Sequence, residues 1–358
     1  MKSNSLTAFA FSFALLGAAN SFGQAQAVTD PVGFITLNIA GGGTPSSPKL
    51  SLISSTLVRP ILYQGLITDI TGTTITVSSS PAAPWATGAF NGANGSHYVE
   101  IISTAVPART GTMADIASTP TTNSIVTVGD LSINQAAVGD TIRIRRDLTI
   151  GELFGATNSA GLLASDDPTS ADEVLIYSAA ASESYFYFTG AEGFPAGWYD
   201  SGFNLAPGVA QNVSIAPNQA VVVKRKAAGA LTITSVGSVK TGNTLFPVVN
   251  GLNVLGTVSA KGLTLATSGL RTANDTTGVK PSDDPATADE VIIYDGSGST
   301  SYFYFTGAEG FPAGWYDSGF NLAPGVADAV IIAPGSAFVV NRKGGPSFNW
   351  VLPSPQSF

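Results

Sequence analysis

The sequence contains no cysteine, a single histidine and few charged residues. Without cysteine, the chain can form neither a disulfide nor a thiolate metal site, so its stability must come from packing. The one histidine, His97, cannot build a multi-histidine metal site. A GxSxG motif is absent, and no other histidine could complete a Ser-His-Asp triad. A general base at this position is conceivable chemically, but a surface or strand-end position is the simpler interpretation.

Basic residues are too scattered for a nucleic-acid-binding face. Charged residues make up 11% of the chain and the net charge is −8. The densest basic group, Arg143, Arg145 and Arg146, lies on one predicted strand. Because nucleic-acid binding needs a concentrated basic surface, we expect no nucleic-acid partner.

Long apolar runs are absent after the N-terminus. Lys2 precedes a short apolar run at 6–19, and Ala25-Gln26-Ala27 fits an A-x-A cleavage site. The run is too short for a permanent membrane helix and is typical of a signal peptide. We therefore expect residues 1–27 to be removed and the mature chain to be exported to the periplasm, cell surface or extracellular space, with no transmembrane segment.

The remaining chain is rich in Gly, Thr, Ser, Ala and Val, with short apolar runs bounded by turn residues. Predicted strands include 33–39, 73–77, 141–145, 173–177 and 220–224. No stretch keeps a capped 3.6-residue apolar period, which leaves only short helical turns at 150–154 and near Ala171. The sequence predicts an all-β fold.

A domain-sized internal repeat decides the architecture. Residues 184–210, SYFYFTGAEGFPAGWYDSGFNLAPGVA, recur unchanged at 301–327. The match continues upstream, where an Ala-Asp-Glu-Val motif begins at Ala171 and again at Ala288. A repeat of this length indicates two homologous domains.

Residues 59–143 have no counterpart in the second copy, although they carry strand signals at 70–77 and 122–128 and close on a turn and strand at 138–144. We predict a small β-barrel inserted into the first of two β-sandwich-like domains, because loop insertions are tolerated. Three domains in series are the alternative. The predicted division is a signal peptide at 1–27, a first repeat domain at 28–58 plus 144–226, the barrel at 59–143, a second repeat domain at 227–346 and a tail at 347–358.

Three motifs run through the mature chain. It begins Thr29-Asp-Pro-Val-Gly-Phe-Ile-Thr-Leu, and a unit of Ala-Asp-Glu-Val, aromatic strand and Gly-Trp-Tyr occurs at 171–199 and 288–316. Each copy then ends in Pro-x-x-Ala-x-Val-Val-x-Arg-Lys. In these features the chain resembles a family of exported, internally duplicated β-rich proteins of environmental Gram-negative bacteria. The resemblance implies export, duplication and β-structure, and it implies no mechanism.

Four adjacent aromatic residues in each copy form the strongest candidate ligand surface. The two-residue period of a strand places Tyr185 and Tyr187 on one face and Phe186 and Phe188 on the other. Exposed Tyr and Trp rings would stack on sugar rings, whereas burial of both faces would make them a core; we favour burial. The candidate ligand-binding residues are Tyr185, Tyr187, Trp198, Tyr199, Tyr302, Tyr304, Trp315 and Tyr316.

An acidic cluster before each aromatic strand is the second candidate site. Carboxylates gathered in a loop can bind Ca²⁺, but a solvated turn capped by aspartate is the competing interpretation. In a cleft, the same residues would form the paired carboxylates of a glycoside hydrolase. The candidate metal ligands are Asp166, Asp167, Asp172, Glu173, Asp283, Asp284, Asp289 and Glu290, and no other cofactor is expected.

These patterns together predict an exported, non-catalytic β-protein that serves as a cell-surface or extracellular binding or structural component. Its partner would be a glycan at the Tyr and Trp surfaces, or other envelope proteins. A purely structural or assembly protein is the first alternative and a secreted hydrolase the second. Exposed Trp198 and Trp315 would favour glycan binding, and a flat uncharged strand edge or apolar patch would favour assembly.

Overall fold

The computed structural model describes residues 30–354, except 81, 93–95, 134, 178–181, 192, 218, 297 and 309. The predicted signal peptide lies outside these residues. In the described part, strands dominate and helix is confined to short turns, so the all-β prediction is confirmed. The helical segments are α1 (Ile150–Phe154), η1 (Pro107–Arg109), η2 (Ala210–Asn212) and η3 (Ala327–Ala329). None of the helices described is long and apolar enough to cross a membrane.

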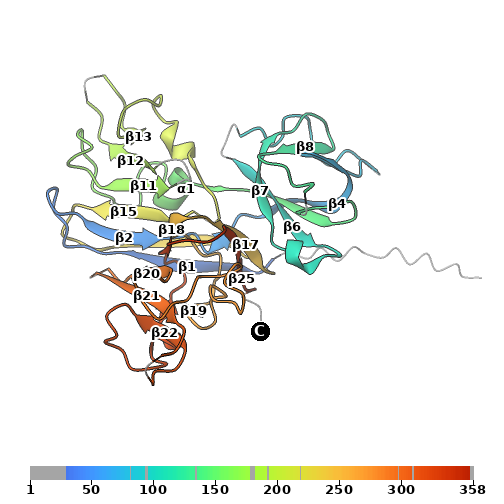
Figure 1. The fold of residues 1–358 in the computed structure, drawn as a ribbon. Coiled ribbons are helices and arrows are strands. Elements are labelled where there is room, and N and C mark those ends of the chain that lie inside the picture. Colours follow the sequence, from blue (N-terminus) through green and yellow to red (C-terminus); the bar gives the residue numbers. More distant parts are fainter. Residues whose placement is uncertain are drawn as a thin grey trace, which may run out of the picture.

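Each copy of the repeat forms a five-stranded antiparallel sheet with the same strand order (Figure 1). The order is β13-β12-β11-β15-β2 in the first copy and β22-β21-β20-β24-β18 in the second. The first sheet contains β2 (Lys49–Ile53), β11 (Glu173–Tyr177), β12 (Ser182–Phe188), β13 (Gly197–Asp200) and β15 (Val221–Arg225). The second contains β18 (Gly251–Leu255), β20 (Glu290–Tyr294), β21 (Ser299–Phe305), β22 (Gly314–Asp317) and β24 (Phe338–Arg342).

Smaller sheets complete each copy. The first copy adds β1 (Val32–Ile39), β3 (Leu57–Val58), β10 (Leu148–Thr149), β14 (Ser214–Ile215) and β16 (Leu231–Val239). The second copy adds β17 (Thr244–Val248), β19 (Leu263–Thr264), β23 (Ile331–Ile332) and β25 (Phe348–Leu352). Pairs β10-β14 and β19-β23 are equivalent, and so are β1-β16 and β17-β25.

Two predicted boundaries differ from this pairing. The segment after 226 was assigned to the second domain, but β16 pairs along its length with β1 of the first copy. The segment 347–358 was assigned to a tail, but β25 pairs with β17 and completes the second copy. Each copy therefore closes on a strand that follows its Arg-Lys motif, a pairing between distant segments that local sequence signals do not reveal.

The predicted small barrel is present as a closed barrel of six strands in the order β4-β5-β8-β7-β6-β9. Its strands are β4 (Ile61–Thr71), β5 (Thr74–Val77), β6 (His97–Ser103), β7 (Met113–Ser118), β8 (Ser124–Thr127) and β9 (Thr141–Arg146). The strand signal at 70–77 contains a turn, because Gly72 takes a positive φ between β4 and β5. The flanking strands β2 and β10 both pair within the first copy, so the barrel interrupts that copy.

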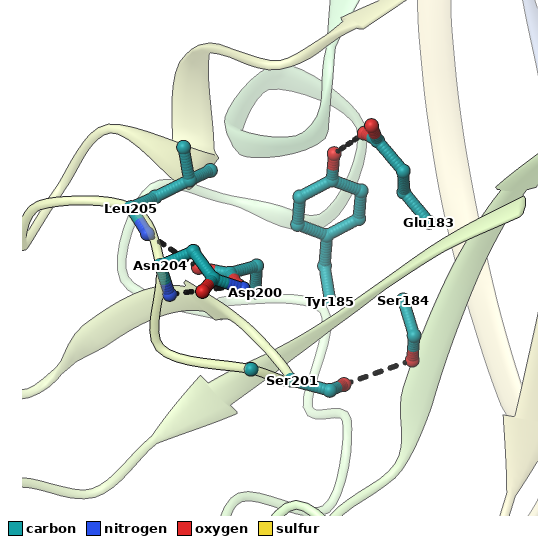
Figure 2. Close-up of a pocket in the computed structure, with 8 residues that line it drawn as sticks. Glu183, Ser184, Tyr185, Asp200, Ser201, Asn204 and Leu205 are labelled. Atoms are coloured by element: carbon teal, nitrogen blue, oxygen red, sulfur yellow. Dashed lines mark hydrogen bonds between the residues drawn. The ribbon is translucent and has the colours of Figure 1, made fainter. Parts of the chain in front are cut away.

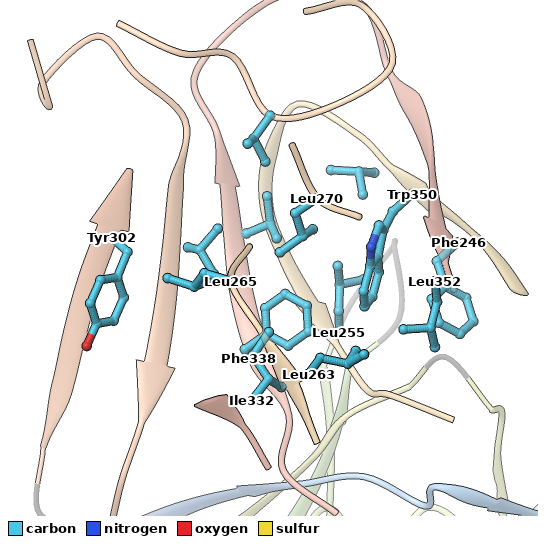
Figure 3. Close-up of a cluster of buried hydrophobic side chains, with 14 of the residues drawn as sticks. Phe246, Leu255, Leu263, Leu265, Leu270, Tyr302, Ile332, Phe338, Trp350 and Leu352 are labelled. Atoms are coloured by element: carbon cyan, nitrogen blue, oxygen red, sulfur yellow. The ribbon is translucent and has the colours of Figure 1, made fainter. Parts of the chain in front are cut away.

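Buried side chains form a separate hydrophobic core in each copy and in the barrel. In the second copy, Trp350 of β25 lies opposite Phe246 of β17 and packs beside Phe338 (Figure 3). Val58 from the first copy belongs to the same cluster, and Met113 of the barrel packs against it. The three parts therefore share apolar contacts as well as chain connections.

Buried ion pairs also attach the barrel to the repeats. Arg145 of β9 pairs with Asp30, which Arg143 approaches to 3.3 Å. Glu100 of β6 pairs at 2.5 Å with Lys240, which directly follows β16. These side chains are almost fully buried, and Arg146, the third member of the densest basic group in the sequence, is partly buried and pairs with Glu152.

Candidate functional site

The aromatic strands have the predicted geometry. The pairing of β12 with β13 brings Tyr187 opposite Trp198, with ring centroids 5.6 Å apart. Phe186 and Phe188 point to the opposite face, where Tyr199 packs against them. The second copy repeats this arrangement, with Tyr304 and Trp315 rings 5.7 Å apart.

Both faces of these strands are covered, so the burial that we favoured from the sequence is confirmed. Trp198 is fully buried, and its Nε1 donates a hydrogen bond to the carbonyl of Gly155 at 2.8 Å. The hydroxyl of Tyr199 donates to the carbonyl of Pro195. The buried members of the candidate set are Tyr185, Trp198, Tyr199, Tyr302, Trp315 and Tyr316. Tyr187 and Tyr304 are half-buried.

The prediction that these rings form a stacking platform for glycans is therefore wrong. An aromatic face in contact with core side chains cannot also contact a sugar. The rings bury large apolar areas in both copies, and packing alone is a sufficient reason for their presence.

Asp172 and Asp289, two of the acidic candidates, are buried in the interior of their copies. Asp172 pairs with Arg225 and accepts hydrogen bonds from the backbone amides of Leu163 and Lys226. In the second copy, Asp289 pairs with Arg342 at 2.6 Å. Each aspartate thus connects the loop before β11 or β20 to β15 or β24, the strand that comes last along the chain in its five-stranded sheet.

The adjacent glutamates, Glu173 and Glu290, pair with lysines at the end of the same strand. Glu173 lies 2.6 Å from Lys226, and Glu290 lies 3.2 Å from Lys343. Partial burial acts to raise the pKa of Glu173, but the Lys226 ammonium outweighs it and holds the pKa below its usual value. Glu173 is therefore ionised and neutralised by lysine, rather than poised as an acid.

The remaining acidic candidates lie in exposed turns. The carboxylate of Asp167 accepts hydrogen bonds from the amide and hydroxyl of Thr169, which lower its pKa, and Asp284 accepts from the amide of Ala286. Asp166 and Asp283 are exposed beside their serine neighbours. Among the described residues, no group of three histidine or acidic side chains could hold a metal ion. Lysine, arginine or turn amides already bind six of the eight candidate carboxylates, so the Ca²⁺ site and the hydrolase cleft stay predictions that these contacts do not favour.

His97 is the first residue of β6 in the barrel, so it takes the strand-end position of the two that we expected, and it is buried rather than on the surface. Its ring centroid is 5.2 Å from that of Phe90. Burial lowers its pKa, and the neighbouring Arg146 acts in the same direction. The imidazole therefore stays neutral in a packed environment, and no second histidine exists to join it.

A polar pocket that the sequence did not single out lies in the first copy (Figure 2). Its volume is about 310 Å³, and β12, β13 and the loop after β13 line it. The hydroxyl of Tyr185 donates to Glu183, and the hydroxyl of Ser201 donates to that of Ser184 at 2.9 Å. Burial and the Glu183 carboxylate raise the pKa of Tyr185, so the phenol remains a donor.

Asp200 shapes one wall of this pocket. It accepts hydrogen bonds from the amides of Asn204 at 2.9 Å and Leu205 at 2.7 Å, within a loop where Phe203 has a φ of +52°. Slight burial acts to raise the pKa of Asp200, but these amides hold it below its usual value. Asp317 organises the matching loop of the second copy in the same way, so this carboxylate has a structural role in both.

Glu183 distinguishes the two copies. The other seven residues that line the pocket recur in the second copy, whereas threonine, Thr300, stands in place of Glu183. The difference lies immediately outside the identical block, and a comparison of the copies for differences, rather than for identity, would have revealed it.

An exposed, uncharged face of β1 and β16 is the second unexpected feature. We call this the β1-β16 surface; it consists of Val32, Phe34, Thr36, Asn38, Thr232, Thr234 and Val236. The period-2 alternation sends Leu37 and Ile39 into the core and leaves these seven side chains in solvent. Phe34 lies directly opposite Val236. Comparison of the chain with protein-family models, with curated proteins and with solved structures gave no match.

Proposed function

We propose that the mature chain is an exported, non-catalytic structural protein whose copies associate through the β1-β16 surface. The pattern of residues 1–27 supports export, since a charged start, a short apolar run and an A-x-A site are typical of a signal peptide. The repeated carboxylates form ion pairs with lysine and arginine, which supports a non-catalytic role.

The apolar exposure of the β1-β16 surface carries the proposal. Val32 is 75% exposed, Phe34 73% and Val236 57%. Large apolar side chains grouped on one exposed face mark interaction sites in soluble proteins. In the described chain, β1 pairs only with β16, so no strand pairs with its other edge, and none of its eight residues is charged.

A second copy of the chain is the partner that this surface fits best. The chain carries a net charge of −8, so copies repel one another over most of their surface. All seven residues of the β1-β16 surface are uncharged, which removes that repulsion where the apolar side chains lie. A two-fold axis would place the surface against itself, as in the commonest class of homodimer.

Light scattering of the mature chain over a range of concentrations tests the association. We expect a dimer or larger assembly for the wild type and a monomer for Phe34→Lys and for Val236→Lys, because a charge would be buried in the contact. Leu62→Lys, at an exposed position of β4, is the matched control and should associate like the wild type. A wild type that is monomeric at every concentration would rule out the proposal.

The polar pocket of the first copy favours binding of a glycan unit as a second candidate function (Figure 2). Its carboxylate, hydroxyl and amide groups suit the hydroxyls of a sugar, and its volume of about 310 Å³ lies within the usual range for ligand pockets. The candidate glycan contacts thus move from the buried aromatic rings to the exposed Glu183 and Asn204.

A glycan array tests this candidate. Glu183→Thr converts the pocket to the sequence of the second copy and should abolish retention of a glycan that the wild type binds. The reciprocal control, Thr300→Glu, changes only the second copy and should leave that retention intact. An array on which the wild type retains no glycan eliminates this candidate.

A further inference from the structure

A cavity larger than the pocket at Glu183 lies where the barrel and both repeat copies meet. Its volume is about 660 Å³, within the range of small-molecule sites, which occur preferentially at domain interfaces. The barrel contributes residues of β7 and the loop after β8, the first copy the segment near Pro217, and the second copy β17, β18 and their connecting turn. Figure 1 shows β7 of the barrel close to β17 of the second copy.

Backbone contacts hold the walls of this cavity in place. The amide of Leu245 donates to the carbonyl of Gly111 in the barrel at 3.0 Å. Gly111 has a φ of +94°, and a Cβ there would lie 2.5 Å from the carbonyl oxygen of Asn243, so only glycine permits this approach. On the other side, a β-bridge joins Gln219 of the first copy to Leu255 of the second. The cavity is therefore largely preformed.

The lining mixes apolar, uncharged polar and acidic residues, with no basic side chain among them; Gln135, Gln219 and Asn250 are among its polar members. Its apolar members include Leu131, Pro217 and Leu245, and its two charged members are Asp115 and Asp130. Burial raises the pKa of Asp115. Since desolvating an anion beside carboxylates is unfavourable, a negatively charged ligand does not fit this lining.

Apolar residues continue from the cavity onto the surface. Leu252 is 69% exposed, Val128 is 62% exposed, and both line the cavity. They come from different parts of the molecule, the second copy and the barrel, so a molecule bound between them would remove both from water. Such burial contributes about 25 cal/mol for each Å² of apolar surface.

Tyr98 lines the cavity, but its hydroxyl is closed off from it. The residue is 1% exposed, and the hydroxyl is buried without a hydrogen-bond partner in the described structure. Burial and the Glu100 carboxylate keep the pKa of this phenol well above its usual value. The hydroxyl is therefore not a contact for a molecule bound in the cavity.

We propose that this junction cavity binds a small organic molecule that carries no negative charge and whose apolar part covers Leu252 and Val128. The site is independent of the β1-β16 surface and of the pocket at Glu183. The cavity proposal can therefore be tested separately from the proposed function.

Fluorescence titration of the mature chain with prodan, a neutral naphthalene ketone, tests the proposal. We expect saturable binding at one site with a blue shift, and binding of the anionic probe 1-anilinonaphthalene-8-sulfonate at least about tenfold weaker because of the two aspartates. Tyr98→Phe removes only a hydroxyl that is closed off from the cavity and should leave prodan binding unchanged.

Variants of the lining locate the probe. Ala216→Trp fills the cavity and should abolish prodan binding, and Leu252→Asp, at an exposed position that is safe for folding, should weaken it about tenfold. Leu62→Asp, exposed on β4 and outside the cavity, is the matched control and should bind like the wild type. Absence of saturable prodan binding, equal affinity for the two leucine variants, or tighter binding of the anionic probe would overturn the proposal.

Discussion

At the scale of single residues, the charged side chains that recur in both copies stabilise the interior of the protein. Asp289 accepts hydrogen bonds from Arg342 and from the backbone amides of Lys280 and Lys343, at 2.6 to 2.8 Å. Arg342 in turn donates to the carbonyls of Gly278 and Pro346. One buried carboxylate thus organises three separate segments, and charged residues that suggested a metal or catalytic site prove to be structural.

Removing the two partners of this ion pair should have unequal effects. Asp289→Ala leaves a buried guanidinium without its counter-ion and two amides without an acceptor, and we expect a loss of about 3–5 kcal/mol in the free energy of unfolding. Arg342→Met leaves the carboxylate with its two amide donors and should cost less, about 2–3 kcal/mol. Urea unfolding followed by tryptophan fluorescence measures both.

The control for this comparison is Arg271→Met, which breaks the surface pair of Arg271 with Asp275 and should cost less than about 1 kcal/mol. Equal effects of Asp289→Ala and Arg342→Met would contradict the structural role that we assign to the amide donors.

At the scale of elements, closing strands complete each copy. β16 and β25 follow the Arg-Lys motif of their copies and pair with the opening strands β1 and β17. In β25, side chains alternate between core and solvent, with Phe348, Trp350 and Leu352 buried. The last strand of the chain is therefore part of the second core, and it cannot be trimmed as a tail.

Trp350→Ala should lower the free energy of unfolding by about 3–5 kcal/mol, because it leaves a cavity and frees the Ser268 carbonyl that its Nε1 bonds at 2.8 Å. Asn349→Ala, on the exposed face of the same strand, should change stability by less than about 0.5 kcal/mol. Thermal melts compare the two. Similar melting temperatures for both variants would show that β25 is dispensable.

At the scale of the whole molecule, the barrel is joined to the repeats by buried charge as well as by apolar packing. Asp147 lies between β9 and β10, where the chain leaves the barrel. Burial and the Asp115 carboxylate raise its pKa to about 8, although Arg146 acts in the opposite direction. The joint between barrel and repeat therefore holds a carboxyl group that is protonated at neutral pH.

This group makes stability depend on pH. In the unfolded chain Asp147 loses its proton near its ordinary pKa of 3.8, whereas in the folded chain it keeps the proton up to about pH 8. Folding therefore takes up a proton between these values, and stability falls as pH rises from about 4 to about 8, by at most about 1.4 kcal/mol per unit. Carboxylates with lowered pKa, such as Glu173, oppose this only at lower pH.

We expect Asp147→Asn to flatten the pH dependence, since asparagine cannot titrate. Urea midpoints of the wild type should fall between about pH 5 and pH 8, and those of the variant should fall less. Parallel pH profiles for the two proteins would mean that Asp147 does not control the joint.

Local patterns in the sequence predicted much of this molecule. The alternation in Tyr185-Phe-Tyr-Phe188 defined the two faces of β12, and the segments 150–154 and 173–177 match α1 and β11. The candidate sites depend on more than such patterns. A strand pattern states which side chains share a face, but it does not state what covers that face, and Arg225 lies 53 residues from the aspartate that it neutralises.

The sequence by itself determined the all-β class, the two copies and the inserted barrel, because turn residues, two-residue periodicity and repetition are local or can be compared along the chain. Only the tertiary structure decided that the aromatic rings are core, that β16 closes the first copy, and that exposed apolar groups gather on the β1-β16 surface and around the junction cavity. These properties depend on contacts between distant segments, which form when backbone pairing and burial are satisfied for the whole chain.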